Sequence, residues 1–379
     1  MKPLRLLSAS SSPSFGGLER FQMEIARNLA SRGHEVEIAA APGSLFATAG
    51  RVAGLPVHEH RFHSYLSPLS TWRLARLMKS REIEVVHYRL SRNIWAMAPA
   101  ARMAGLKGRV VHTLGMNPGG RLDNPVHHWL RNTLGAFVAP TPVTAMKAAS
   151  VWGMQEDEVT VIPNFVARAP FEAGNIGQDA AALRVSWGIP TESQLVGTVA
   201  RLEPAKGIDT FVRTAIAILN EYPQLDLRFV VGGPVTREWR SWADELKELV
   251  SSAGLAERII FPGHQDNIPA FMKTLDLFVL PSHKETFGIV LLEAMVSGKA
   301  VIACHGPGPD YILDNGKAGL LVDPDDQAAL GQAILSLLEK ADYRDHLAAA
   351  GLSQVRSNFT DEVVLPAYEA LFERVRSGD

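Results

Sequence analysis

Apolar runs of strand length alternate with longer periodic segments along most of the 379 residues, and this alternation limits the fold more than any other feature. Runs such as 84–88 and 195–200 are short and are bounded by polar or turn-forming residues, as buried strands are. In the segments between such runs, apolar residues recur three and four positions apart, which is typical of helices. The pattern predicts an α/β protein with parallel sheets that are covered by helices.

The alternation occurs twice, which predicts two similar-sized, doubly wound domains. Between them, in residues 169–179, the periodicity stops and Pro170, Gly174 and Gly177 occur close together, so we expect a linker there. The first domain then spans residues 1–168 and the second 180–361. We expect strands at 4–9, 35–41, 84–88, 109–114, 136–140, 159–163, 195–200, 227–232, 258–261, 277–280 and 300–303, and helices that include 17–31, 69–80, 95–104, 207–221 and 361–376.

Composition restricts the class of protein. Hydrophobic residues make up 46% and charged residues 21%, which is ordinary for a globular chain. The sequence has no run of about 18 apolar residues, so we expect no transmembrane helix. The apolar run 4–9 is too short for a signal peptide. The single cysteine, Cys304, cannot form an internal disulfide, which favours a reducing compartment. We therefore expect a cytoplasmic protein.

The two halves of the chain differ in charge. Residues 1–165 contain 19 Lys and Arg against 11 Asp and Glu, whereas the remainder contains 19 against 29. A basic half favours an anionic partner, such as a lipid surface or a phosphorylated acceptor, although a chance imbalance of surface charge is the alternative. No nucleic-acid-binding motif accompanies the charge, so we expect no nucleic acid as a partner.

Two carboxylates eight positions apart, Glu285 and Glu293, mark the strongest candidate site. Glu285 follows the expected strand 277–280, and Glu293 lies about two turns into a helix that is expected to begin near Phe287. Ligands of open α/β sheets bind at this edge, and the first amides of a helix favour an anion. Gly288 has no side chain, so a ligand can approach the backbone there. Amides for phosphate and carboxylates for hydroxyl groups suit a nucleotide-sugar.

Two basic residues occupy the corresponding turn at the start of the second domain. In Arg201-Leu-Glu-Pro-Ala-Lys206-Gly207 the preceding strand ends near Ala200, so Arg201 and Lys206 emerge at the ligand edge. Two cations at that edge can bind a phosphate or diphosphate group without a metal ion. The alternative is a pair of solvated basic residues that flank a turn.

These segments together resemble retaining glycosyltransferases, most closely glycosyltransferase family 4. The resemblance rests on the E-x7-E spacing within Pro281-Ser-His-Lys-Glu285-Thr-Phe-Gly-Ile-Val-Leu-Leu-Glu293-Ala-Met and on the R-x4-K-G segment at 201–207. It implies the GT-B fold, in which two Rossmann-like domains face each other across a cleft and the last helix, 362–379, returns to the first domain. It also implies that a nucleotide-sugar binds the second domain, that the acceptor binds the first, and that no cofactor or metal is required.

The same resemblance assigns roles to particular residues. In the family, Arg201 and Lys206 would bind the diphosphate, Glu285 would contact hydroxyl groups of the donor sugar, and Glu293 would bind the ribose. The remaining donor-binding positions that it implies are Gly16, Gly17, Gly263, His264, Thr286, Phe287, Gly288 and Ile289. The catalytic set that it implies is His112, Glu285, Arg201 and Lys206.

Several of these assignments have competitors. His112 is expected near the reacting sugar. The alternatives are that His112 is a buried histidine with satisfied hydrogen bonds, or that His87 is the cleft histidine instead. Asn164 resembles a strand-end residue near the hinge, but Phe165 stands where many members have Gly. The paired glycines Gly16 and Gly17 also suit an ordinary tight turn before a helix.

Two further segments depart from simple expectations. His305-Gly-Pro-Gly-Pro-Asp310 differs from the usual Gly-Gly-x-Pro-Glu segment of the family, which puts donor-sugar contacts there in doubt. Asp323-Pro-Asp325 spells D-x-D, the metal-binding pattern of other glycosyltransferases, but it precedes a helix and is interpreted as a capping turn. We expect no metal site, because no His, Cys and Asp cluster elsewhere has the spacing of metal ligands.

Two expected helices of the first domain, 69–79 and 126–134, combine Trp and Leu with Arg, Lys or His. Basic amphipathic helices can lie on an anionic membrane, although most such helices simply cover a sheet.

The sequence therefore predicts a retaining, metal-independent hexosyltransferase of cell-envelope polysaccharide synthesis. A UDP-sugar is the favoured donor and GDP-mannose the second choice, and the acceptor is a glycan or a glycolipid. The alternatives are a nucleotide-sugar 2-epimerase of the same fold and a non-catalytic nucleotide-sugar-binding protein. A dehydrogenase is disfavoured because the first strand is not followed by the G-x-G-x-x-G fingerprint.

Overall fold

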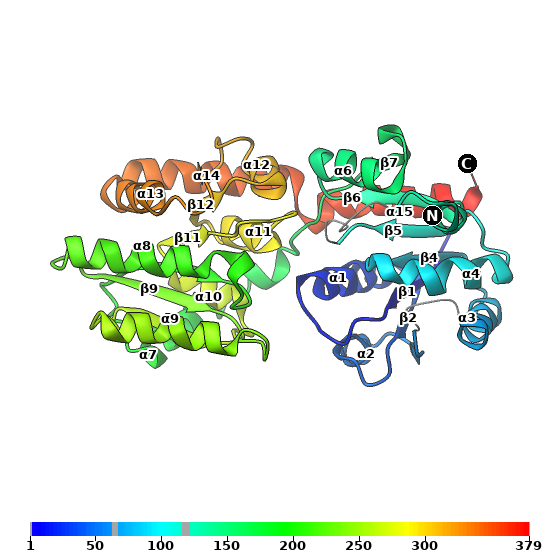
Figure 1. The fold of residues 1–379 in the computed structure, drawn as a ribbon, viewed down its shortest axis with the longest axis horizontal. Coiled ribbons are helices and arrows are strands. Elements are labelled where there is room, and N and C mark those ends of the chain that lie inside the picture. Colours follow the sequence, from blue (N-terminus) through cyan, green and yellow to red (C-terminus); the bar gives the residue numbers. More distant parts are fainter. Residues whose placement is uncertain (1, 63–66, 116–121, 379) are drawn as a thin grey trace. The chain divides into compact units, whose positions relative to one another are not determined.

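The chain consists of two compact units, each with one parallel sheet (Figure 1). A computed structural model describes residues 2–62, 67–115 and 122–378. The N-terminal unit contains residues 1–164 and 361–379, and the C-terminal unit contains residues 165–360. The chain passes from one unit to the other after Asn164 and returns after Thr360.

The N-terminal unit has a sheet whose strands within the described residues follow the order β3-β2-β1-β4-β5-β6-β7. The strands are β1 (Arg5–Ser10), β2 (Glu35–Ala40), β3 (Val57–Glu59), β4 (Val85–Tyr88), β5 (Val110–Thr113), β6 (Leu134–Ala139) and β7 (Val159–Val161). All neighbours are parallel, and β4 and β5 are buried at every position. Burial on both faces explains why these strands appear in the sequence as continuous apolar runs.

The C-terminal unit has a second parallel sheet, which the structure describes in the order β10-β9-β8-β11-β12-β13. Its strands are β8 (Gln194–Val199), β9 (Leu227–Gly232), β10 (Ile259–Gly263), β11 (Leu277–Leu280), β12 (Ala300–Cys304) and β13 (Leu320–Val322). The chain builds outward from β8 in one direction through β9 and β10, and then in the other direction through β11, β12 and β13. The point between β8 and β11 is therefore the topological switch of this sheet.

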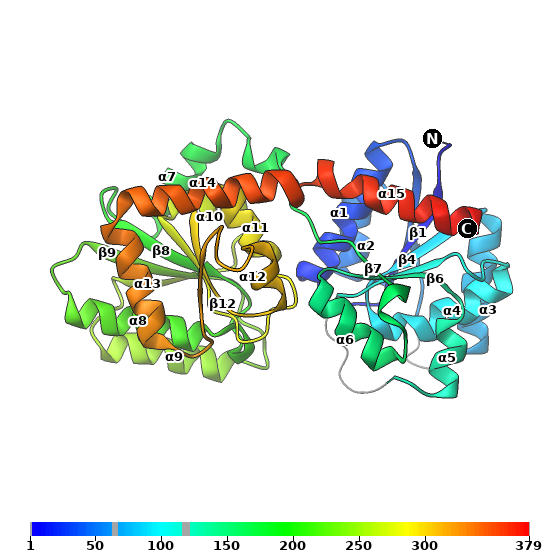
Figure 2. The same cartoon turned by 90° about the horizontal axis from the view of Figure 1, so that it is seen from above.

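Helices cover both faces of each sheet (Figure 2). In the N-terminal unit they are α1 (Gly17–Ser31), α2 (Leu45–Val52), α3 (Pro68–Ser80), α4 (Ile94–Ala104), α5 (Pro125–Arg131), α6 (Pro142–Trp152) and α15 (Asp361–Ser377). In the C-terminal unit they are α7 (Ile176–Ser186), α8 (Ile208–Glu221), α9 (Arg240–Ser252), α10 (Ile268–Thr274), α11 (Ile289–Val296), α12 (Pro307–Ile312), α13 (Gln327–Glu339) and α14 (Ala341–Asn358). Short 3-10 helices lie at Ser91–Asn93, Glu156–Glu158, Ala169–Phe171 and Pro204–Lys206.

The apolar faces of these helices form the cores. In the N-terminal unit α3, α4, α5 and α6 pack on one face of the sheet through residues such as Leu74, Met97 and Trp152. In the C-terminal unit α8, α9 and α13 share one core with the sheet, and α10, α11 and α12 contribute to a second core on its other face. Each sheet is thus the middle of three layers, which leaves the strand ends as the sites where polar residues meet solvent.

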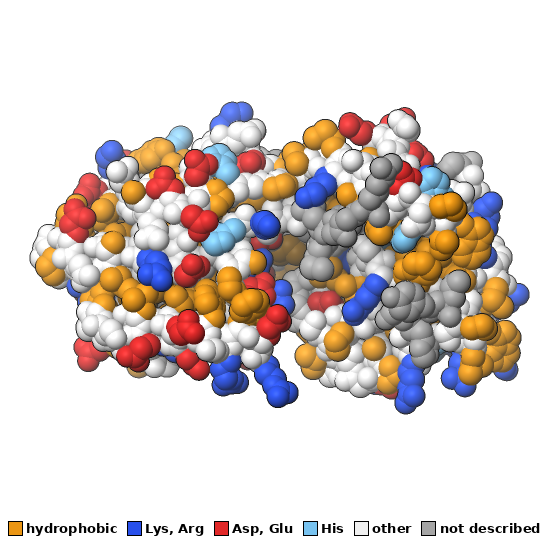
Figure 3. Space-filling view, in the orientation of Figure 1, with side chains coloured by type: hydrophobic (Ala, Val, Ile, Leu, Met, Phe, Trp, Pro, Cys, Tyr) orange, Lys and Arg blue, Asp and Glu red, His pale blue; other side chains and the backbone are white. Residues whose placement is uncertain are grey.

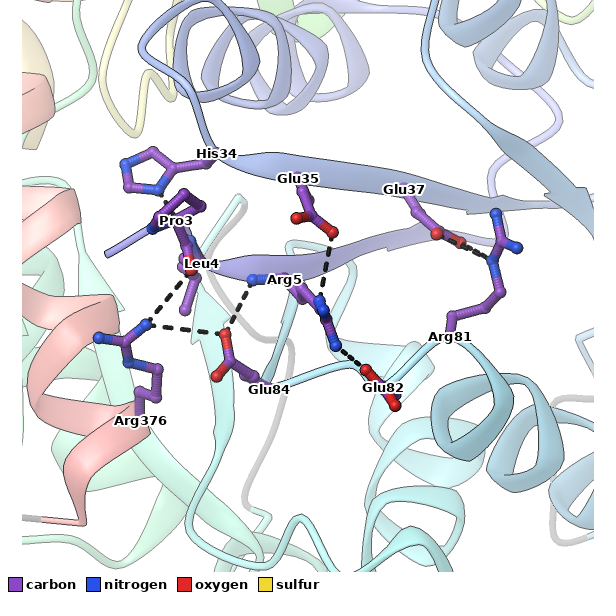
Figure 4. A network of polar contacts seen from close by, with 10 residues as sticks. All are labelled: Pro3, Leu4, Arg5, His34, Glu35, Glu37, Arg81, Glu82, Glu84 and Arg376. Carbon is purple, nitrogen blue, oxygen red and sulfur yellow. Dashed lines mark hydrogen bonds and ion pairs between the residues drawn. The ribbon is translucent and has the colours of Figure 1, made fainter. Parts of the chain in front are cut away.

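The last helix, α15, belongs to the N-terminal unit, as the family resemblance implied. Glu369 of α15 is almost fully buried and accepts hydrogen bonds from Nε and Nη2 of Arg32 at 2.6 and 2.8 Å, and this pairing lowers the pKa of the Glu369 carboxyl. Arg376 lies 3.7 Å from Glu84 and donates to the carbonyl of Pro3, beside the ion pair between Arg5 and Glu35 (Figure 4). These contacts attach α15 to the amino ends of β1 and β4.

Most expected elements are present, with shifts of a few residues at their ends. Among the short elements, α2, β3 and β13 were not predicted. The prediction that residues 169–179 are irregular was wrong. They contain the 3-10 helix Ala169–Phe171 and the first turn of α7. Ala180 is the buried residue of α7, so this helix has no apolar stripe that a periodicity search can find.

Candidate donor site and its counterpart in the N-terminal unit

The loops at the switch point of the C-terminal sheet bring Lys206 and Glu285 together. Lys206 ends the 3-10 helix that follows β8, and Glu285 lies in the loop between β11 and α11. The Lys206 Nζ atom donates to Glu285 Oε2 at 2.9 Å, and both side chains are largely but not fully buried. Two residues 79 positions apart in sequence thus form a charged pair at the edge where ligands of such sheets bind.

A close approach of the two loops holds this pair in place. Gly207 has a φ of +62°, and a Cβ atom there would lie 1.9 Å from the carbonyl oxygen of Pro281. The amide of His283 donates to the carbonyl of Ala205 at 3.2 Å, which joins the same two loops. Gly207 is therefore needed both for its left-handed backbone and for the absence of a side chain.

Arg201, the second expected diphosphate ligand, is exposed at the end of β8 and pairs with Glu203, whose Oε1 lies 3.1 Å from Nη2. Sequence reasoning did not single out Glu203. Its position within the 201–207 segment was the available signal. Both cations of this site are thus held by carboxylates of the chain itself.

The start of α11 forms the floor of the site. The side chain of Phe287 is buried and packs edge-on against Phe359, so only its backbone is available to a ligand. Gly288 has a φ of +93° and directly precedes α11, while Thr286 and Ile289 are half-buried. The first amides of α11 carry the positive end of the helix dipole and favour an anion.

Glu293 lies closer to the helix start than expected. Because α11 begins at Ile289, two residues after the expected start, Glu293 is the fifth residue of the helix and lies in its second turn. Its side chain is half-buried.

The loop after β12 closes against the loop that carries Glu285. A Cβ atom at Gly308 would lie 2.0 Å from the carbonyl oxygen of Phe287, and the Gly308 amide donates to the carbonyl of Glu285 at 3.4 Å. Asp310 is paired with His305 of its own loop at 2.8 Å. The sequence did not predict this pair. The family pattern places the carboxylate of Asp310 near the donor sugar, and His305 is already a partner of that carboxylate.

Gly263 and His264 end the outermost strand of this sheet. Gly263 has a φ of +79°, and its carbonyl accepts a hydrogen bond from the Gly233 amide at the end of β9. His264 is half-exposed and pairs with Asp266 at 3.2 Å. Because β9 separates β10 from β8, these residues lie two strands away from the strand that leads to Arg201.

Gly16 and Gly17 lie at the corresponding edge of the N-terminal sheet, between β1 and α1. The Gly16 amide donates to Glu19 Oε2 at 2.9 Å, while a Cβ atom at Gly17 would meet nothing within 4 Å. Glycine at 17 is therefore not required by packing, and open space adjoins the first residue of α1.

His112 is not a surface residue of this edge. Its ring is fully buried in β5, stacks on Tyr88 at 4.7 Å and meets Phe137 edge-on at 4.6 Å. Burial lowers the pKa of His112 to about 3, and it does the same for His87, whose Nε2 lies 2.9 Å from Thr113 Oγ1. Both rings are therefore buried within the N-terminal unit, and the role of His112 near the reacting sugar, with His87 as its competitor, stays a prediction.

Arg89, the residue after β4, was missed by sequence reasoning. Its guanidinium is buried over the ring of Phe21 and donates to Asn164 Oδ1 at 3.2 Å. Burial lowers its pKa, while the nearby hydroxyl of Tyr368 raises it. Arg89 thereby connects Asn164, the last residue before the chain leaves this unit, with Tyr368 of α15, the helix on which the chain returns. A charged residue directly after an apolar strand was the available signal.

The D-x-D segment contacts α8 and the loop after β11. Asp325 has a φ of +65°, accepts from Thr210 Oγ1 at 3.1 Å and lies 2.9 Å from His283 Nε2, whereas the cap of α13 is the next residue, Asp326. No group of three or more His, Cys, Asp or Glu in the described part of the chain is placed to hold a metal ion. No helix among the described residues is long and apolar enough to cross a membrane.

Comparison with known families assigns each unit separately. Residues 179–354 match the model of glycosyl transferases group 1, and residues 15–169 match that of glycosyltransferase family 4. The first match covers the loops with Lys206 and Glu285, and the second covers the loop with Gly16 and Gly17.

Relatives and solved structures agree over nearly the whole chain. The chain is 28% identical to a D-inositol 3-phosphate glycosyltransferase of Acidothermus cellulolyticus, over 95% of this chain and 87% of that protein. It is also 28% identical to the lipopolysaccharide core biosynthesis glycosyltransferase LpsD of Rhizobium meliloti, over 95% of both chains. The crystal structure of Anabaena HepE with UDP and glucose superposes with a TM-score of 0.82 at 19% identity, over 98% of this chain and 99% of that one. The fold is therefore the GT-B fold of glycosyltransferases.

Proposed function

The chain belongs to glycosyltransferase family 4, and from this premise we propose that it transfers a hexose from a nucleotide-diphosphate sugar to a glycan or glycolipid of the cell envelope. The pairing of Lys206 with Glu285 at the switch point of the C-terminal sheet carries the proposal. One loop edge there offers a cation for the diphosphate and a carboxylate for sugar hydroxyl groups, next to the first amides of α11.

A UDP-sugar is the proposed donor, with GDP-mannose as the second choice. Support for UDP comes from the neighbour HepE, which was crystallised with UDP and glucose. Arg201 and Lys206 would neutralise the diphosphate, Glu285 would accept hydrogen bonds from the sugar, and Glu293 would bind the ribose hydroxyl groups. The two cations and the helix amides supply the charge stabilisation that other enzymes obtain from a metal ion, so we propose a metal-independent reaction.

The proposed transfer retains the configuration at the anomeric carbon. The bond from that carbon to the diphosphate breaks, the acceptor hydroxyl attacks from the same face, and its proton passes to the leaving phosphate oxygen. Lys206 and Arg201 would stabilise the charge on the leaving group as it grows. An inverted product, followed by NMR before mutarotation, would contradict this stereochemistry.

The proposed acceptor is anionic. The relatives named above act in lipopolysaccharide core biosynthesis or on D-inositol 3-phosphate, as their names state. The basic N-terminal half of this chain suits such acceptors, and we propose that it works at an anionic membrane surface.

The test is turnover of UDP-, GDP- and ADP-sugars in the presence of EDTA, with wild type compared with Arg201→Ala. Release of nucleotide from one donor, lost in the variant, is the expected result and identifies the sugar. Release that begins only after Mn²⁺ is added would contradict the metal-independent site. If the protein instead converts the sugar of the donor into its 2-epimer when no acceptor is present, it is a 2-epimerase.

A further inference from the structure

Helices α3, α4 and α5 of the N-terminal unit contain no acidic residue. Their sequences carry basic residues at Arg73, Arg76, Lys79, Arg102 and Arg131 and neither Asp nor Glu. The helices are neighbours, because α4 packs against both α3 and α5. One face of this unit therefore presents a positive charge that no carboxylate of its own helices offsets.

Large apolar side chains are exposed among these basic residues. Between 44% and 57% of the surface of each of five residues is open to solvent, namely Leu69, Trp72, Met103, Val126 and Trp129. On α3 the exposed positions 69, 72, 73, 76 and 79 have the spacing of a single helix face. Figure 3 shows apolar side chains next to basic ones over α3 and α4. Apolar residues that cluster on a surface in this way mark an interaction site.

Arginine side chains hold the two tryptophan rings on the surface. The guanidinium of Arg76 lies 5.5 Å from the centre of the Trp72 ring, and that of Arg102 lies 4.8 Å from the Trp129 ring. Arg102 is itself fixed, because it donates to Thr133 Oγ1 at 2.6 Å and to the Trp129 carbonyl at 3.0 Å. Each ring is thus kept beside a cation, as aromatic side chains are at membrane interfaces.

A groove of about 460 Å³ runs beside Trp72. It is lined by Trp72, Ala75, Arg76, Lys79 and Ser80 of α3 and by Met103 of α4. Two cations, a hydroxyl and Trp72 from α3, with Met103 from α4, match a phosphate that is attached to an apolar chain.

The basic residues of α3 differ from several other basic residues of the same unit. Arg5, Arg32 and Arg81 each pair with a glutamate. Within the described residues Arg73, Arg76 and Lys79 have no ion pair, so their charge remains available to a partner.

We propose that the exposed face of α3, α4 and α5, called here the basic-aromatic face, docks on an anionic lipid bilayer, with a lipid phosphate in the groove between Arg76, Lys79 and Met103. The exposed Trp and Leu side chains enter the interface and the cations meet the headgroups. This docking rests on the proposed function only through the choice of an envelope acceptor, because lipid binding is measurable without donor or acceptor.

The test is co-sedimentation of the full chain with vesicles of phosphatidylcholine, alone or with about one third phosphatidylglycerol. We expect binding only to the anionic vesicles, and weaker binding as salt is raised. Replacement of Arg73, Arg76 and Lys79 by Glu is expected to lower the partition coefficient at least about 100-fold, since each basic residue near such a surface contributes roughly fivefold. Trp72→Ala with Trp129→Ala is expected to lower it as well, without a change of charge.

A matched control reverses three exposed basic residues of the C-terminal unit, Arg213, Arg237 and Lys247, and so changes the net charge equally. We expect this control to bind the vesicles much more tightly than the α3 variant. Far-UV circular dichroism and thermal unfolding show whether each variant is folded, and Arg76→Gln with Lys79→Gln serves if the triple variant is not. Equal loss in the control, unchanged binding by the α3 variants, or no binding by wild type would each overturn the docking, whatever the outcome for sugar transfer.

Discussion

The two units share one architecture but place their charged residues differently. In the C-terminal unit, ion pairs lie on the loops at the carboxyl ends of β8, β11 and β12, and they are half-buried or exposed. At the corresponding edge of the N-terminal unit, Arg89, His87 and His112 are buried and packed against aromatic rings. Polar groups that remain in reach of solvent can exchange one partner for a ligand, whereas those in a core mainly determine stability. The comparison therefore favours the C-terminal edge as the place of the proposed donor site.

The largest expected effect is that of Lys206→Ala. It removes the cation nearest to Glu285 and leaves that carboxylate without its partner, so kcat/KM for the donor should fall about 1,000-fold. Lys284→Ala is the matched control, because Lys284 is exposed in the same loop and has no ion pair among the described residues. Steady-state turnover of the identified donor provides the measurement. Equal activities of the two variants would remove Lys206 from the site.

Glu285→Gln separates nucleotide binding from sugar transfer. Glu285 accepts a hydrogen bond from Lys206 at 2.9 Å, so a diphosphate that binds Lys206 competes with this carboxylate. We expect UDP or GDP to bind several-fold more tightly to the variant, because Lys206 is released, while kcat falls about 100-fold because a hydroxyl contact is lost. Calorimetry with the nucleotide and turnover with the donor measure the two effects. Weaker nucleotide binding would contradict the competition.

The loops that carry these residues were predictable because short motifs identify them. Arg201, Lys206, Glu285 and Glu293 occur in segments whose strand, turn and helix follow directly from local sequence. The sequence places Glu203 and Asp310 in these loops, but it does not show which basic side chain each of them contacts. That contact depends on how the side chains orient in the folded loops.

The burial of His112 could not be predicted from the sequence, for a different reason. A histidine at the end of an apolar run is compatible both with a site at the strand end and with a position in the core. Its place in the run does not distinguish these two positions. β5 ends one residue later, at Thr113, and the helix layer covers its side chains. Likewise, β3 and β13 have only three residues each, too few to establish a period.

The buried histidines predict a pH dependence that is specific to the N-terminal unit. Folding lowers the pKa of His87 and His112 from 6.5 to about 3, so the unfolded chain binds protons that the folded chain does not. The stability that the neutral rings provide is complete above about pH 6.5 and is lost as the pH falls. Between pH 7.5 and 5.5 the loss should be about 1.4 kcal/mol for each histidine, or about 2.7 kcal/mol together.

Hydrogen exchange of the β4 and β5 amides at these two pH values measures this loss. In His112→Phe the pH-dependent part should fall by about half, even if the variant is less stable overall. A free energy of opening for β4 and β5 that does not change with pH would contradict the burial of neutral rings.

Glycine substitutions sharpen the comparison between the two edges. Gly207→Ala should cost about 1–3 kcal/mol, because the backbone has a positive φ and the new Cβ meets the Pro281 carbonyl. Gly17→Ala should change stability by less than about 1 kcal/mol, since open space surrounds that position. Urea unfolding of both variants provides the test. A large loss of stability in Gly17→Ala would show that its loop is as tightly packed as the one at Gly207.

The measurement that tests the central claim most directly is hydrogen–deuterium exchange of the full chain with and without UDP or GDP. The account predicts that nucleotide slows exchange in the loops 200–207 and 281–289 of the C-terminal unit and leaves α3 and α5 of the N-terminal unit unchanged. Protection confined to the N-terminal unit, with no change in those two loops, would contradict the assignment of the donor site.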